Sequence, residues 1–214
     1  MKKALILCSI FLLLQGCSFI TDYQVSNQLV DSVEQLVNQE NANDWTRKNM
    51  NMYYKNMELS MNEFNKTIQE TGKADSAELK KLLKDMDTII VELEKYKTEE
   101  EKVKQQLAQH METAQKLSDE KQQLAMPVLN HFKQLVEHEI RLADVNILIL
   151  QTNKKYYNAI VKKEKPSKDK YEQLNKERKQ LMKEIESLIP TFNRSWENFS
   201  REITGQPLKK SSQN

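Results

Sequence analysis

The chain has 214 residues, with 33 lysines and arginines against 31 aspartates and glutamates, and only three glycines, four prolines and two cysteines. So few glycines exclude a glycine-rich phosphate-binding loop and the tight turns of an all-β fold, and two cysteines exclude a disulfide scaffold and a four-thiolate zinc site. The mean hydropathy of −0.75 is polar, yet apolar residues recur at helical intervals, which argues against disorder.

The first 16 residues have the pattern of a secretory signal peptide, in which a short basic start precedes an apolar run. That run ends at Leu14 and is too short for a membrane-spanning helix, which needs about 20 residues. It closes on Leu14-Gln15-Gly16-Cys17, which resembles the bacterial lipobox. The resemblance implies cleavage between Gly16 and Cys17 and a diacylglycerol thioether on Cys17. Residues 17–24 would then be a lipid-anchored linker.

Processing at this site would change the charge balance. Without Lys2 and Lys3, the basic residues equal the 31 acidic ones in number, so an overall basic surface for nucleic acid has no support. Cys17 would be the one remaining cysteine. We therefore expect a chain on the extracytoplasmic face of the cell membrane, with the membrane as a partner through its lipid, no nucleic acid partner, and no cofactor besides the covalent diacylglycerol.

Apolar spacing over residues 25–204 predicts an all-α fold, an elongated antiparallel bundle of three to five long helices with coiled-coil-like heptad packing. The strongest segment is one helix over 76–126, opened by a capping box of Asp75 and Glu78 and broken or kinked at Pro127. Steps of three and four residues give its seam, which is apolar except at three positions: Leu79, Leu82, Met86, Ile89, Leu93, Tyr96, Glu100, Val103, Leu107, His110, Ala114, Leu117, Lys121, Leu124, Val128.

The flanking segments are also helical in pattern. An apolar stripe runs from Val25 to Ile68 with a weak point at 38–44, which leaves open whether residues 22–70 form one helix or two, and Gly72 should stop them. A helix after Pro127 leads to a polar turn at 162–170. A last helix then places Tyr171, Leu174, Leu181, Ile185, Leu188, Phe192 and Phe199 on one side, before a disordered polar tail at 205–214.

Catalytic and metal sites have little support. His131 and His138 share a helix face, but the positions between them at which a third ligand would lie hold Gln134 and Leu135, so a surface or seam histidine is the better interpretation. Carboxylates are numerous, but a charge run on a long helix is usually a solvated face. We expect no enzyme and no metal.

A basic stretch at residues 154–183 is the more informative feature, with 11 lysines and arginines against four acids and with tyrosines interleaved. A cationic hairpin tip of this kind could bind anionic envelope polymers such as teichoic acids, or acidic headgroups. The alternative is an exposed tip kept soluble by lysine. The candidate contact residues form the turn itself: Lys162, Lys163, Lys165, Lys168 and Lys170.

With the lipobox and the helices in place, the chain resembles the YkyA-like family of cell-wall-binding lipoproteins and is similar to staphylococcal lipoproteins with a Glu-Met-Tyr-Tyr motif. The matching segments are the lipobox, the Asn51-Met52-Tyr53-Tyr54 segment, in which Asn51 replaces the family's Glu, and the long heptad helix. The resemblance implies a non-enzymatic surface lipoprotein that binds the cell wall or acts as a spacer. The alternative is a protein-interaction lipoprotein, such as a phage or plasmid exclusion factor or an accessory subunit of a membrane complex.

Overall fold

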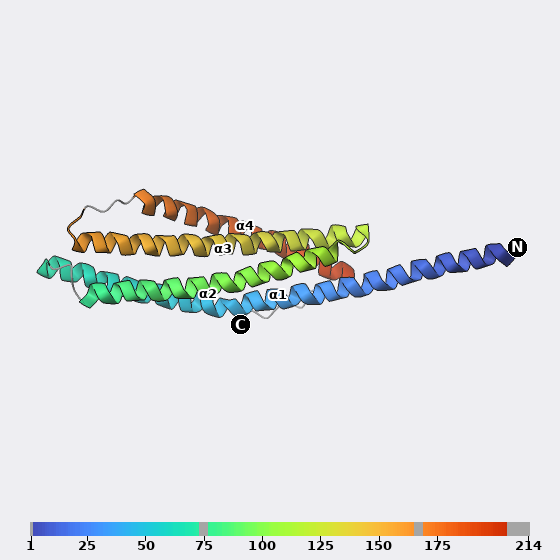
Figure 1. The fold of residues 1–214 in the computed structure, drawn as a ribbon, viewed down its shortest axis with the longest axis horizontal. Helices are drawn as coiled ribbons and strands as arrows, with labels where there is room; N and C mark the ends of the chain where they lie inside the picture. The colour runs from blue at the N-terminus through green and yellow to red at the C-terminus, as the bar shows by residue number, and fades with distance from the viewer. Residues whose placement is uncertain (1, 73–76, 165–168, 205–214) are drawn as a thin grey trace. The chain divides into compact units, whose positions relative to one another are not determined.

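The computed structural model describes residues 2–72, 77–164 and 169–204, with side chains from Asp22 on except those of 41–49 and 51. Four α-helices and no strand occur in this described part (Figure 1). The all-α prediction is confirmed. The helices are α1 (Lys2–Thr71), α2 (Ala77–Ala114), α3 (Asp119–Val161) and α4 (Asp169–Thr204).

The chain divides into two compact units, and each contains a segment of every helix. Unit 1 comprises Met1–Val37, Lys104–Gln134 and Leu188–Asn214. Unit 2 comprises Asn38–Val103 and Leu135–Ser187.

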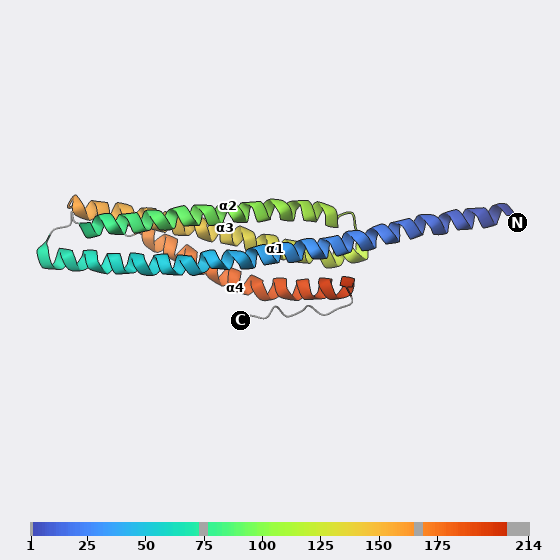
Figure 2. The ribbon, with the colours of Figure 1, turned by 90° about the horizontal axis from the view of Figure 1, so that it is seen from below.

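Unit 2 is an antiparallel four-helix arrangement (Figures 1 and 2). Polar contacts between neighbouring helices show that these helices are antiparallel. As the residue number rises along one helix, the residue number of the contact partner on the next helix falls. The contacts join Ser60 to Asp85 and Glu63 to Lys81 between α1 and α2, Lys97 to Asp144 and Asp87 to Lys154 between α2 and α3, and Arg141 to Glu177 and His138 to Glu184 between α3 and α4.

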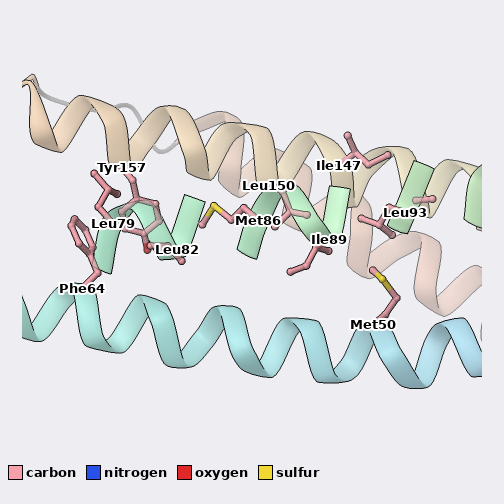
Figure 3. Packing of buried hydrophobic residues seen from close by; sticks show 11 residues of the cluster. Met50, Phe64, Leu79, Leu82, Met86, Ile89, Leu93, Ile147, Leu150 and Tyr157 are labelled. Carbon is pink, nitrogen blue, oxygen red and sulfur yellow. The ribbon is translucent and has the colours of Figure 1, made fainter. Parts of the chain in front are cut away.

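The core of unit 2 confirms the predicted seam. Figure 3 shows Met50 and Phe64 of α1 directed toward the seam residues of α2 and toward Ile147, Leu150 and Tyr157 of α3. The rings of Phe64 and Tyr157 meet edge to face, with centroids 5.4 Å apart. A second cluster covers the other side of α3: Val145, Ile149, Leu174 and Leu181. Because α3 packs against other helices on two sides, packing within the unit accounts for its apolar run at 147–150.

Unit 1 is held by its own apolar residues. Leu29 and Val33 of α1 are buried, as are Val128 and Leu129 of α3 and Phe199 of α4. Phe132 and Phe192 pack with ring centroids 5.0 Å apart. Large apolar side chains from distant parts of the sequence thus exclude water from this unit.

The break between α2 and α3 lies at residues 115–118, so the predicted single helix over 76–126 is wrong. Ser118 directly precedes α3: its carbonyl accepts a hydrogen bond from Gln122 N at 2.8 Å, and two acids, Asp119 and Glu120, follow it. A serine before two acids favours a helix start, because the acids oppose the positive helix end. Pro127 was predicted to break or kink the helix; it does not break it, and it lies exposed inside α3.

Helix α1 is a single helix, which answers the question left open at 38–44. It also passes through residues 17–24, where a linker was expected. At the first described side chain of this helix, the Asp22 carboxylate accepts hydrogen bonds from Ser118 N at 2.9 Å and Ser118 Oγ at 2.8 Å. The helix ends at Thr71, and Gly72 follows in the left-handed region with φ of 65°, as an αL helix cap requires.

Candidate functional site

The basic turn after α3 is only partly described. Lys162, Lys163 and Lys170 are exposed, whereas Lys165 and Lys168 lie outside the described residues. The same holds for Asp75 of the predicted capping box and for the expected tail at 205–214, and no side chain is described at Gly16 or Cys17.

Lys163 holds an unusual backbone position. It has φ of 57°, and the chain around it forms a Schellman end for α3, with Glu164 N bonded to Ala159 O at 2.9 Å and Lys163 N bonded to Ile160 O at 3.0 Å. Glycine is the usual residue here, because a side chain in the left-handed region costs about 1 kcal/mol. The chain thus presents a lysine at the turn despite a conformational penalty.

The cations of α3, of α4 and of the turn between them differ in their partners. Lys154 pairs with Asp87, and Arg141 pairs with Glu177 through Nη2 at 2.5 Å. By contrast, no carboxylate of the described residues lies within ion-pairing distance of five lysines: Lys162, Lys163, Lys170, Lys176 and Lys179. Their charges therefore act outward, which gives this end of unit 2 a positive potential.

An open groove of about 530 Å³ lies on α4 beside these lysines. Its lining comes from one helix: Tyr171, Glu172, Asn175, Lys176, Arg178 and Lys179. Tyr171 was predicted to be inward-facing, but it is 39% exposed. The prediction followed the apolar period into the first turn of α4. The buried stripe of α4 begins at Leu174 instead.

Tyrosines surround the inner side of this region. Tyr156 and Tyr157 meet edge to face at 5.5 Å. Burial raises the pKa of Tyr157, and the neighbouring Tyr156 and Tyr171 add to the effect. Burial likewise raises the pKa of Tyr54, against the opposing charge of Arg178. These hydroxyls therefore stay protonated at neutral pH, and the formal charge of the groove comes from its three cations and Glu172.

A second cluster lies in the interior of unit 2 and was not predicted. Glu40 of α1, Glu100 of α2 and Glu139 of α3 bring carboxylate oxygens within 4.8 Å of one another. Glu100 is fully buried. Its signal in the sequence was a carboxylate at one of the three polar positions of the seam. Carboxylate oxygens suit hard cations such as Mg²⁺ or Ca²⁺, and a proton shared among them would also relieve the repulsion.

Tyr96 of α2 also contacts this cluster, because its hydroxyl donates a hydrogen bond to Glu139 Oε2. Burial raises the pKa of Tyr96 well above its usual range, and the charges of Glu139, Glu100 and Glu40 raise it further. The phenol is therefore a fixed donor that stabilises the Glu139 carboxylate.

The histidines have separate partners. His131 Nδ1 lies 3.0 Å from Ser195 Oγ, and His138 Nε2 lies 3.3 Å from the Glu184 carboxylate. Burial lowers the pKa of His110. In the described part of the chain, no group of three or more metal-ligating residues close enough to hold a metal ion includes any of these three histidines.

Comparisons with known proteins found no relative of this chain. A scan against protein-family models, a search of curated proteins and a search of solved structures each returned no match. In the described residues, no helix combines the length and the apolar character needed to cross a membrane. The YkyA-like resemblance stays a prediction.

Proposed function

We propose that this chain is a non-enzymatic bacterial surface lipoprotein, tethered to the extracytoplasmic face of the cell membrane through a diacylglycerol on Cys17. The support is the segment Leu14-Gln15-Gly16-Cys17 after an apolar run. Two acyl chains give stable anchoring where one gives only marginal binding, since each buried CH₂ contributes about 0.8 kcal/mol.

We further propose that the anchored chain is a cell-wall-binding or spacing module, and that its contact with envelope polymer is made at the basic end of unit 2. The observation that carries this proposal is the set of exposed turn lysines without carboxylate partners in the described residues, Lys162, Lys163 and Lys170. Lysines that maintained only solubility would not need a left-handed backbone position, whereas Lys163 occupies one.

Co-sedimentation with purified cell-wall sacculi tests this function. Neutralising Lys162, Lys163, Lys165 and Lys168 together as glutamines should reduce the sedimented fraction, and added salt should reduce it for the unmodified chain. The matched control carries four glutamines at exposed lysines elsewhere in unit 2: Lys55, Lys80, Lys84 and Lys102. Equal retention of the turn variant and the unmodified chain would refute polymer binding at this turn.

A second candidate is a protein-interaction lipoprotein, such as an exclusion factor or an accessory subunit. It is favoured by Met52 and Leu59, which lie seven residues apart on α1 and are 51% and 53% exposed. Met52 falls within the apolar stripe predicted upstream of Gly72, but it does not face the core, which corrects the prediction at this position. If this alternative holds, the double variant Met52→Gln with Leu59→Gln should abolish crosslinking to one stoichiometric envelope protein. If it does not hold, the same variant should leave sacculus binding unchanged.

A further inference from the structure

The groove on α4 has the features of an anion site rather than of a solvated helix face. Lys176 and Lys179 are exposed and lie three residues apart, so they are neighbours on one side of the helix. Neither has a carboxylate partner in the described part of the chain. With Arg178 the groove holds three cations against Glu172 alone.

Arg178 differs from the two lysines because it is partly buried. Its Nε is covered by protein and has no hydrogen-bond acceptor among the described residues, and its charge acts on Tyr54 of α1. Partial burial restricts the Arg178 side chain before a ligand arrives, so binding loses less side-chain entropy than it would at an exposed lysine. A covered donor without an acceptor is also unfavourable. A small movement toward an anionic oxygen would relieve that cost.

We propose that this groove binds phosphate, and that its occupant is a phosphodiester group of an anionic envelope polymer. The proposal rests on the proposed function and names its ligand class. Each phosphodiester of such a polymer carries one negative charge on its two free oxygens, which accept hydrogen bonds from ammonium and guanidinium groups, so successive phosphates can meet different cations of the groove. The exposed ring of Tyr171 lies in the same groove and gives the uncharged segment between phosphates an apolar surface.

Binding of the full chain in detergent to poly(glycerol phosphate), measured at low ionic strength, tests the site. Lys176→Gln with Lys179→Gln should weaken binding about tenfold. The control, Lys80→Gln with Lys84→Gln, makes the same charge change at two exposed lysines of α2 in the same unit and should keep the affinity within about twofold. Thermal unfolding by circular dichroism checks that both variants fold.

Two further probes distinguish the sources of the anion. Polyglutamate of equal charge should bind more weakly than poly(glycerol phosphate) if the groove recognises the phosphodiester itself rather than negative charge in general. Vesicles containing phosphatidylglycerol present the same phosphodiester on a lipid. If the groove variant loses vesicle binding and keeps polymer binding, the occupant is a lipid headgroup and the polymer proposal is overturned.

The control variant distinguishes a general effect of positive charge on binding from binding at a defined site. Equal losses in the groove variant and the control, or equal affinity for polyglutamate, would overturn the phosphate site. The proposed function would still stand if sacculus binding depended on Lys162 and Lys163. No sacculus binding by the unmodified chain would overturn both.

Discussion

The contact between Asp22 and Ser118 carries the sharpest stability prediction. Asp22 accepts hydrogen bonds of 2.9 Å and 2.8 Å from the backbone and side chain of Ser118, 96 positions away, and its carboxylate lies 3.4 Å from Lys121 Nζ. The Asp22 side chain is 16% exposed. A hydrogen bond to a charged group contributes about 1.5–3 kcal/mol, and the exposed position of Ser118 favours the low end.

Asp22→Ala should therefore lower the free energy of unfolding by about 2 kcal/mol, and Asp22→Asn, which keeps one acceptor oxygen, by about half of that. The assay is urea unfolding followed by circular dichroism, with hydrogen exchange at residues 115–122. Exchange should accelerate there, because these residues contain the start of α3. The control is Asp31→Ala, an exposed acid of the same helix.

The pH dependence gives a second readout. Burial opposes ionisation of Asp22, but the hydrogen bonds from Ser118 and the charge of Lys121 outweigh it and lower the pKa of Asp22. A lowered folded-state pKa means that the contribution is present above the unfolded value of about 3.9 and is lost as the pH falls through the folded value. The difference between the unmodified chain and Asp22→Asn should thus shrink in acid. An Asp22→Ala variant as stable as Asp31→Ala would refute the reasoning.

Three further predictions follow from single residues. Tyr96→Phe should destabilise unit 2 by about 1.5–3 kcal/mol, because the Glu139 carboxylate loses its donor; a loss no larger than that of Tyr23→Phe, at an exposed ring, would contradict this. Lys163→Gly should raise stability by about 0.5–1 kcal/mol in thermal unfolding, by removing left-handed strain, yet weaken sacculus binding; unchanged stability would argue against strain. Burial lowers the pKa of His110, so the free energy of unfolding should fall as the pH falls below about 6.5. His110→Gln should reduce this pH dependence in urea titrations, and an unchanged pH dependence would exclude His110 as its source.

The heptad seam of α2 could be predicted, because helical period and burial are local consequences of side-chain spacing. Leu82, Met86 and Ile89 are buried as their spacing required. Gly72 also ends α1 as expected, since its left-handed conformation is one that other residues rarely adopt.

The helix break at Ser118 was missed because proline was given more weight than capping. Pro127 removes one backbone donor, but it is exposed, and buried Ala125, Val128 and Leu129 on either side hold α3 together. The signal for the break was present as a serine before two acids.

The glutamate cluster could not be derived from the sequence, because Glu40, Glu100 and Glu139 come from three helices and meet only through tertiary packing. The groove could be predicted only in part. The excess of lysines was visible, but which of them pair with acids depends on the register of α3 against α4 and α2.

The intact mass of the chain extracted from bacterial membranes tests the central claim most directly. A surface lipoprotein predicts a product that begins at Cys17 and carries the mass of a diacylglycerol on its sulfur. A membrane-extracted product that begins before Cys17, or that has a free thiol at this cysteine, would contradict the lipid anchor.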